Sequence, residues 1–333
     1  MNRNLKNALA LGALVLLGTA NAANAQTYVF DSEIGGYGSG DGQINSPYGI
    51  SFDNNGNLFV ADYGNDRIDK FDSGGSFVRS ISSGGFGQDR LYRPVGIALD
   101  DNGDLYIADY GNNRVAKFNS NGAFIRNIGS VGLGNGQYEF PAGVTLDGSG
   151  NLYVSDYYGN RIVKFNRNGE FTQIIGAEQL GRPAGVALDD NNNLYIADNT
   201  NNRITEFDSE GALIRTLGKY GSSDGQIINP ADVALDRSGN IYTTDLGNSR
   251  IVEFDNHGVF VQDIGGYGSG KEQLNQPVGI AFDSSGNLYV ADTGNNRIVK
   301  FDVVPGAVPE PSGVALLLGM ASVGVSVLHR RRK

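Results

Sequence analysis

Apolar residues along this chain come in short runs separated by Gly- and Asn-rich segments, and the same order of runs returns six times. Each copy opens with a proline, carries an aspartate fifteen residues later and an arginine five residues after that. The opening residues are Pro47, Pro94, Pro141, Pro183, Pro230 and Pro277, at steps of 47, 47, 42, 47 and 47 residues. A fixed period in the forties indicates one supersecondary unit that is copied and stacked, because a single unit cannot bury its own apolar faces.

Each copy reads as a set of antiparallel hairpins. In the last copy the runs 277–282, 288–292 and 297–302 are β-rich and are joined by turns of about four residues rich in Gly and Asn. Earlier copies add a fourth run, such as 77–81, which is more polar and therefore suits an outer edge. The second run is apolar at consecutive positions, as in 105–108, so both faces of its sheet must be covered.

The two ends of the repeated region complement each other. The sixth copy stops after its third run, at Asp302, whereas the segment 30–38 matches the fourth run at 260–268 without a preceding copy of its own. We therefore predict an all-β, six-bladed β-propeller over residues 26–302 with four-stranded antiparallel blades. The segment 28–36 is predicted to pair with 297–302, complete the last blade and close the ring. Closure removes free sheet edges, so we expect a monomer.

The repeats resemble NHL repeats over residues 28–302. The shared sequence motifs are Pro-x-Gly-Ile/Val-Ala-x-Asp, then Asn-Leu-Tyr-Val-Ala-Asp, then Asn-x-Arg-Ile. A Gly-rich segment, which we call the lead-in, precedes the Pro of each copy. This resemblance implies the same six-bladed propeller. The chain departs from the pattern at Asp232, which replaces the first-run Gly, and at Ser155 and Thr244, which replace Ala. The fourth lead-in is also five residues shorter than the others.

Residues 1–25 have the pattern of a secretory signal peptide. Arg3 and Lys6 precede the apolar stretch 8–18, and small residues at Ala23 and Ala25 suit cleavage by signal peptidase before Gln26. An uncleaved membrane anchor is the alternative, which the short apolar run disfavours.

The C-terminal end has three parts in order. A linker (303–312) contains Pro309, Glu310 and Pro311; a charge-free stretch (313–328) follows; and a basic tail (329–333) ends the chain. Sixteen residues of helix span about 24 Å, short of a hydrocarbon core of about 30 Å, and the basic tail favours a cytoplasmic C-terminus. We expect a short transmembrane helix over 313–328. This tail is interpreted as a sorting signal that is later processed, and an ordinary C-terminal membrane anchor is the alternative.

This tail resembles the PEP-CTERM sorting signal of Gram-negative bacteria. The resemblance implies recognition by an exosortase and delivery to the cell envelope or extracellular matrix, often alongside exopolysaccharide production. Membrane attachment through 313–328 would then precede processing.

Charge and composition exclude several function classes. Residues 26–329 carry 20 basic and 36 acidic residues, a formal charge of −16, which opposes nucleic-acid binding. The chain has no Cys, so disulfides, thiolate metal sites and a Cys nucleophile are excluded. Its two histidines, His257 and His329, are too few for a His-rich zinc site.

The repeated Asp and Arg lie in the hairpin between the second and third runs. The six carboxylates could form a metal site, or the six arginines could form an anion site. We predict instead a structural role in every blade, because a residue repeated in each copy performs what each copy needs. The pairs are Asp62–Arg67, Asp109–Arg114, Asp156–Arg161, Asp198–Arg203, Asp245–Arg250 and Asp292–Arg297. The Asp-x-x-Gly turns resemble calcium loops faintly but lack the bidentate Glu of such loops.

Function is expected where the copies differ. The lead-ins and the second-to-third-run hairpins emerge at one end of the blades, so their variable residues share a surface. Tyrosine combines apolar area with a hydrogen-bonding tip, which suits contacts with a protein or a polysaccharide. The alternative is that these rings only shield the blade ends. The candidate binding residues are Tyr37, Tyr63, Phe86, Arg93, Tyr110, Tyr157, Tyr220 and Tyr267.

Some six-bladed propellers are enzymes, and the resemblance raises that alternative. Amidating lyases hold zinc with several histidines and streptogramin lyases need a catalytic His, neither of which can be assigned here. Lactonase-type propellers use acidic and amide ligands for a divalent cation, and Asp232 is the one out-of-pattern carboxylate. We expect a non-catalytic binding protein without a cofactor, with a metal-dependent hydrolase centred on Asp232 as the alternative. A sensor would need a partner to supply its output.

Overall fold

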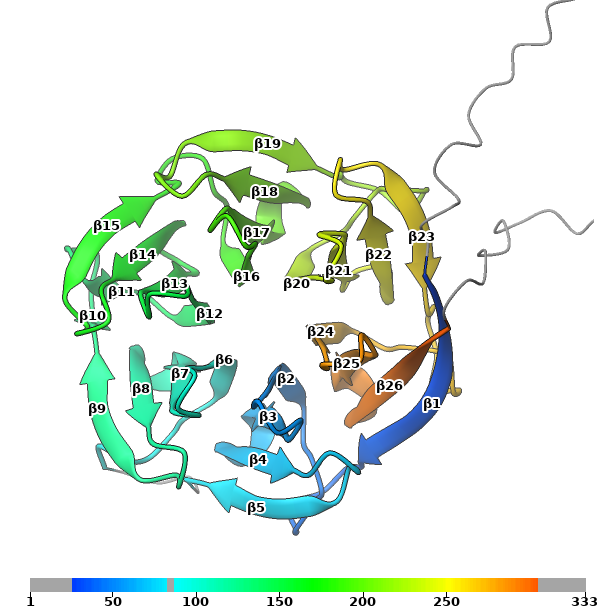
Figure 1. Cartoon of the computed structure of the whole chain (residues 1–333), viewed down its shortest axis with the longest axis horizontal. Coiled ribbons are helices and arrows are strands. Elements are labelled where there is room, and N and C mark those ends of the chain that lie inside the picture. Colours follow the sequence, from blue (N-terminus) through cyan, green and yellow to red (C-terminus); the bar gives the residue numbers. More distant parts are fainter. Residues whose placement is uncertain (1–25, 83–86, 305–333) are drawn as a thin grey trace, which may run out of the picture.

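The computed structural model describes residues 26–82 and 87–304. Six four-stranded antiparallel sheets stand around a central axis like the blades of a propeller, and Figure 1 looks down that axis. The first strand of each blade is innermost and the fourth is outermost (Figure 1). The predicted fold class and blade count are therefore confirmed.

Blades 1 to 3 follow one another along the chain. Blade 1 contains β2 (Pro47–Phe52), β3 (Leu58–Asp62), β4 (Arg67–Phe71) and β5 (Phe77–Ile81). Blade 2 contains β6 (Pro94–Leu99), β7 (Leu105–Asp109), β8 (Arg114–Phe118) and β9 (Phe124–Ile128). Blade 3 contains β12 (Pro141–Leu146), β13 (Leu152–Asp156), β14 (Arg161–Phe165) and β15 (Phe171–Ile175).

Blades 4 to 6 complete the ring. Blade 4 contains β16 (Pro183–Leu188), β17 (Leu194–Asp198), β18 (Arg203–Phe207) and β19 (Leu213–Leu217). Blade 5 contains β20 (Pro230–Leu235), β21 (Ile241–Asp245), β22 (Arg250–Phe254) and β23 (Phe260–Ile264). Blade 6 contains β24 (Pro277–Phe282), β25 (Leu288–Asp292), β26 (Arg297–Val304) and the N-terminal β1 (Thr27–Gly35).

Short elements occupy the loops at one end of the blades. The lead-in to blade 3 forms a two-residue parallel ladder between β10 (Ser130–Val131) and β11 (Gln137–Tyr138). Four of the hairpins between second and third strands contain a 3-10 turn. These turns are η2 (Tyr63–Asn65), η3 (Tyr110–Asn112), η4 (Asn199–Asn201) and η5 (Thr293–Asn295).

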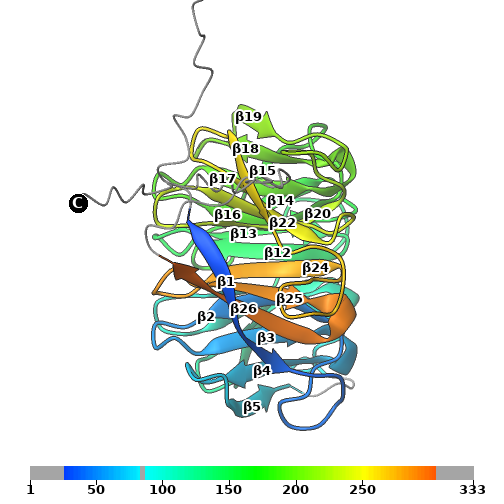
Figure 2. The same ribbon diagram turned by 90° about the vertical axis from the view of Figure 1, so that its right-hand side faces the viewer.

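The N-terminal strand closes the ring, as predicted. β1 pairs antiparallel with β26, with Thr27 opposite Val304 and Gly35 opposite Arg297. The two strands lie side by side in both views (Figures 1 and 2). Glu33 and Arg297 add an ion pair of 2.6 Å across the seam. The observed strand begins one residue before the predicted 28–36, and β26 continues two residues past the predicted end at 302.

The apolar core lies between neighbouring blades. All five residues of every second strand are buried, which confirms that both faces of these sheets are covered. One cluster, for example, joins Phe59 and Ile68 of blade 1 to Ile97 and Ile107 of blade 2. Each fully buried side chain of this size stabilises the fold by about 1.5–3 kcal/mol.

Every first strand contains a β-bulge, and the bulge residues line the central channel. In blade 1, Pro47 faces Asp62 but Ile50 faces Val60, so Tyr48 and Gly49 together oppose one residue. A Cβ at Gly49 would overlap a carbonyl oxygen of the next blade, which explains the repeated Gly. The equivalent residues of the other blades are Gly96, Gly143, Gly185, Asp232 and Gly279.

The predicted terminal signals lie outside the described residues. These are the signal peptide (1–25), the motif Pro309-Glu310-Pro311, the span 313–328 and the tail 329–333. Within residues 26–82 and 87–304, no helix has the length and apolar character that a membrane crossing requires.

Candidate functional site

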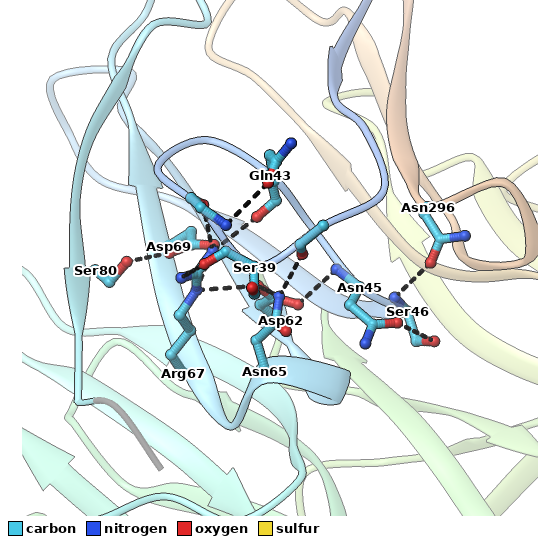
Figure 3. A network of polar contacts seen from close by, with 12 residues as sticks. Ser39, Gln43, Asn45, Ser46, Asp62, Asn65, Arg67, Asp69, Ser80 and Asn296 are labelled. Carbon is cyan, nitrogen blue, oxygen red and sulfur yellow. Dashed lines mark hydrogen bonds and ion pairs between the residues drawn. The ribbon is translucent and has the colours of Figure 1, made fainter.

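The Asp/Arg pairs join each lead-in to the hairpin of its own blade. In blade 1 the buried Asp62 accepts the backbone N–H of Asn45 at Oδ1 (2.8 Å) and Arg67 Nε at Oδ2 (3.0 Å). Arg67 in turn donates to the carbonyl groups of Ser39 (2.9 Å) and Gln43 (2.7 Å). Figure 3 shows this network. In all six blades the Nε–Oδ2 distance lies between 2.7 and 3.0 Å.

Both carboxylate oxygens of these aspartates are therefore occupied by donors of the same blade. In blade 1, Asn65 adds a hydrogen bond to Oδ2 of Asp62 (2.7 Å). Among the described residues, no group of three or more His, Asp or Glu side chains is arranged to hold a metal ion. The geometry suits the structural role that we predicted for the pairs.

A second repeated contact links each hairpin to the following blade. The residue before the Arg has a left-handed backbone, and its side chain accepts the N–H of the residue before the next Pro. Asn113 Oδ1 accepts from Phe140 (2.8 Å), and Asn296 Oδ1 accepts from Ser46 across the seam (2.8 Å). We call these contacts inter-blade clasps. The others join Asp66 to Arg93, Asn160 to Arg182, Asn202 to Asn229 and Ser249 to Gln276.

The lead-in end of the central channel widens into a cavity of about 270 Å³, which we call the cup. Its floor is the ring of bulge residues from all six blades. Its wall is asymmetric. Blades 1 to 3 supply the aromatic side, whereas blades 4 and 5 supply Asn199 and Leu246. The tyrosines that line the cup are Tyr48, Tyr63, Tyr110, Tyr157 and Tyr158.

The aromatic side of the cup is held together by ring contacts. Tyr48 stacks on Tyr63 with 4.4 Å between ring centroids. Phe140 lies 4.8 Å from Tyr110 and 5.0 Å from Tyr158, again between centroids, and so joins blades 2 and 3. Such ring pairs each contribute about 0.5–1.5 kcal/mol beyond their buried area, so the wall is pre-formed.

Burial keeps the phenol groups of Tyr48 and Tyr110 protonated at neutral pH. Burial raises the pKa of Tyr48, and the neighbouring Tyr63 and Tyr157 raise it further. Burial also raises the pKa of Tyr110, reinforced by the adjacent Tyr158. The wall of the cup thus contains several tyrosines, and a phenol hydroxyl can both donate and accept a hydrogen bond.

Asp232 is the one acidic residue in the floor. Its Oδ1 accepts the N–H of Val233 (2.9 Å), and its Oδ2 accepts the N–H of Ile280 in the next blade (3.1 Å). Burial raises its pKa to about 7. It lines both the cup and a second chamber of about 360 Å³ on the far side of the floor.

The two departures at the end of the second strand also belong to this floor. Thr244 accepts the N–H of Asp232 (2.8 Å) and donates to the carbonyl of Val278 in blade 6 (2.9 Å). Ser155 likewise accepts from Gly143 (2.6 Å) and donates to Ala184 in blade 4 (2.5 Å). Hydroxyl groups in place of Ala thus bridge neighbouring blades around the channel.

The structure divides the predicted binding residues into separate groups. Tyr63, Tyr110 and Tyr157 meet in the cup, and Arg93 lies over the ring of Tyr63. The remaining three described tyrosines do not line it. They sit on lead-ins with 71–76% of their surface exposed, and they are Tyr37, Tyr220 and Tyr267. Phe86 lies outside the described residues.

Sequence reasoning missed Tyr48, Tyr158 and Phe140. Tyr48 follows the repeated Pro, where the other copies carry Val or Ala, and Tyr158 stands where four copies carry Gly. Both residues are aromatic where the other copies are not, and this departure from the repeat could have identified them from the sequence. Asn199 and Thr293 occupy the position of the cup tyrosines but donate to Pro carbonyls of the next blade instead.

Comparison with protein families supports the interpretation of the repeats. The NHL repeat model matches residues 91–118, 139–165, 180–207, 228–254 and 274–301, which cover strands of blades 2 to 6. The chain contains five NHL repeats. No curated protein matches its sequence.

Several solved structures share this propeller fold at low identity. The gluconolactonase XC5397 of Xanthomonas campestris is 16% identical over 85% of this chain and 98% of its own, with a TM-score of 0.62. Virginiamycin B lyase of Staphylococcus aureus is 14% identical over 84% and 100%, with a TM-score of 0.59. A chain of a nidogen/laminin complex is 21% identical over 72% and 85%, also at 0.59. These similarities establish the fold alone.

Proposed function

We propose that this protein is an exported NHL-repeat propeller that binds a polysaccharide without chemical turnover, using the cup at the mouth of its channel. The observation that carries the proposal is the one-sided tyrosine wall. Five tyrosines from blades 1 to 3 converge there, while blades 4 to 6 contribute no aromatic residue to the lining of the cup.

The chemistry of the wall suits sugar rings. Tyrosine faces pack against the apolar C–H faces of a sugar, and phenol hydroxyls exchange hydrogen bonds with sugar hydroxyls. The volume of about 270 Å³ is just below the range of about 300–1,000 Å³ typical of ligand pockets. The cup therefore suits the end or a branch of a chain. A protein partner would have to use the surrounding loops as well, because standard protein interfaces cover about 800 Å² per partner.

The proposed location follows from the terminal segments. Residues 1–25 would be removed by signal peptidase, and the Pro309-Glu310-Pro311 tail would be recognised by an exosortase in the envelope of a Gram-negative bacterium. A polysaccharide ligand in the envelope or extracellular matrix fits that location.

The proposal is tested by exchanging two matched sets of tyrosines. Replacing Tyr63, Tyr110 and Tyr157 together by Ala should weaken binding to matrix polysaccharide at least tenfold, because buried aromatic contacts dominate such sites. Affinity electrophoresis in gels containing the polysaccharide measures the loss, and urea unfolding confirms that the variant folds.

The matched control replaces the three exposed lead-in tyrosines, Tyr37, Tyr220 and Tyr267, by Ala. This variant should bind as the unmodified protein does. Loss of binding in the control, with the cup variant unaffected, would place recognition on the lead-in loops and reject the cup.

A divalent-metal-dependent hydrolase of the lactonase type is the second candidate. It is favoured by Asp232, the one carboxylate among the described residues that line the cup and the second chamber, with a pKa of about 7. It is also favoured by a fold shared with a gluconolactonase. Both Asp232 oxygens already accept backbone N–H groups, which weighs against it. Elemental analysis of the purified protein, with ester and lactone substrates, decides: the absence of both a stoichiometric divalent ion and turnover rejects this candidate.

A further inference from the structure

Two arginines stand at equivalent points on the aromatic side of the cup. Arg93 and Arg182 each immediately precede the first proline of a blade, and an inter-blade clasp holds the backbone N–H of each. The guanidinium carbon of Arg93 lies 5.7 Å from the ring centre of Tyr63. That of Arg182 lies 5.9 Å from Tyr157 and 5.2 Å from Tyr158. All three of these rings line the cup.

These two side chains differ from the arginines that hold the blades together. Each blade Arg forms an ion pair with its Asp, and Arg79 of the outer strand β5 donates to the carbonyls of Ser120 and Asn121. Within residues 26–82 and 87–304, neither Arg93 nor Arg182 forms an ion pair with a carboxylate, although the protein is strongly acidic. Both side chains are exposed.

A guanidinium packed over an aromatic ring keeps its N–H donors for another partner. Cation–π contact fixes the plane of the group, and the donors along its edge match the two oxygens of a carboxylate. Phe140 occupies the same pre-proline position in the blade between them. We call the six pre-proline residues the rim of the cup. Three successive rim positions are therefore a cation, an aromatic ring and a second cation.

The opposite side of the rim has a different character. The three remaining pre-proline residues are Asn229, Gln276 and Ser46, all neutral and polar. Among the six pre-proline positions, cations therefore occur only on the side where the tyrosines gather, so charge and aromatic surface are combined there.

We propose that the saccharide held by the cup is anionic, a chain of uronic-acid type whose carboxylates contact Arg93 and Arg182 while its rings pack on the tyrosine wall. This inference rests on the proposed function and names the chemical class of its ligand. A chain lying along the rim across blades 2 to 4 meets the two guanidinium groups on either side of Phe140.

The test compares one sugar with and without its charge. Calorimetry on the full chain should detect binding to oligogalacturonate that weakens as salt is raised, and at least tenfold weaker binding to the methyl-esterified form. The double variant Arg93→Gln, Arg182→Gln should lose at least tenfold in affinity for the acid form and keep its affinity for the ester. The matched control Arg79→Gln removes the same charge from the outer strand and should bind as the unmodified protein does.

The outcomes separate the two proposals. If the unmodified protein binds acid and ester equally, or if the double variant binds the acid form unchanged, the anionic class is wrong while polysaccharide binding stands. If neither form binds and the triple cup variant also leaves matrix binding unchanged, both proposals fall. Calorimetry with dextran sulfate, compared with uncharged dextran, shows whether the protein binds sulfate esters in place of carboxylates.

Discussion

Single residues in this propeller fall into those that recur in every blade and those that break the pattern around the channel. The recurring Asp and Arg saturate each other and the lead-in backbone, as in the bonds of Asp109 to Arg114 (2.7 Å) and to the N–H of Tyr92 (2.7 Å). Asp232 breaks the pattern at one of six equivalent floor positions. Its carboxyl group accepts only backbone hydrogen bonds, and among the described residues no cation neutralises it.

Asp232 should make the protein less stable as pH rises. Its folded pKa of about 7 exceeds the unfolded value of about 3.9, so the folded state binds the proton more tightly. Its contribution to the free energy of unfolding should therefore fall between about pH 4 and pH 7, by at most about 1.4 kcal/mol per pH unit, and stay level above that.

Urea unfolding of the unmodified protein and of Asp232→Asn at several pH values between 5 and 8 measures this contribution. Asp69 and Glu253 also have a pKa of about 7 but are present in both proteins, so their effects cancel in the difference. The variant should lose less stability over this range. Parallel curves for the two proteins would contradict the assignment.

Among the structural elements, the hairpin between the second and third strands makes contacts both within its own blade and with the next blade. Its aspartate fixes the lead-in of its own blade, and its left-handed residue forms the clasp to the next blade. Through the clasps, the hairpins set the positions of the pre-proline residues, including Arg93, Phe140 and Arg182. The shape of the cup is therefore tied to contacts between blades.

The clasp is tested at Asn113, whose φ is 53°. Asn113→Gly keeps the left-handed backbone but leaves the N–H of Phe140 without its partner, at a cost of about 1–3 kcal/mol in the free energy of unfolding. Asn113→Ala should cost about 1–2 kcal/mol more, because a Cβ disfavours this conformation.

Ser249→Gly serves as the matched comparison in urea unfolding. Its Oγ lies 3.3 Å from the nitrogen of Gln276, against 2.8 Å for the contact of Asn113, so its removal should cost less. Equal stability of Asn113→Gly and the unmodified protein would show that the clasp does not hold the blades.

At the scale of the whole molecule, the ring depends on one seam between segments far apart in sequence. β1 and β26 pair along their length, and the ion pairs Glu33–Arg297 (2.6 Å) and Asp31–Lys300 (2.8 Å) reinforce the seam. Tyr28 also contacts Tyr242 of blade 5, with 5.8 Å between ring centroids. The strand thus joins blade 6 to its neighbour as well as completing it.

Deleting residues 27–35 should lower the melting temperature, broaden the transition and turn the expected monomer into oligomers, because the edge of β26 becomes free. Calorimetry and size-exclusion chromatography measure these changes. A synthetic peptide of residues 26–36 added to the deleted protein should restore the monomer, and a scrambled peptide should not. A deleted protein that stays monomeric with an unchanged melting temperature would contradict the role of the seam.

Much of this architecture followed from patterns that are local in sequence. The period gave the blades, consecutive apolar residues gave the buried second strands, and the unmatched segment near residue 30 gave the closing strand. The three tyrosines after the repeated Asp were expected to share a surface, and they meet in the cup. Tyr37, Tyr220 and Tyr267 were grouped with them, yet they stand apart on exposed loops.

The sequence by itself determined how many blades form, where their strands lie and how the ring closes, because hydrogen-bonded hairpins depend on neighbouring residues and a fixed repeat. Only the tertiary structure decided which side chains reach the axis. The inward bulge places Tyr48 and Asp232 in the channel, and the packing of adjacent blades brings Phe140 between Tyr110 and Tyr158. Distance from the axis is a property of the assembled ring, and no spacing within one repeat encodes it.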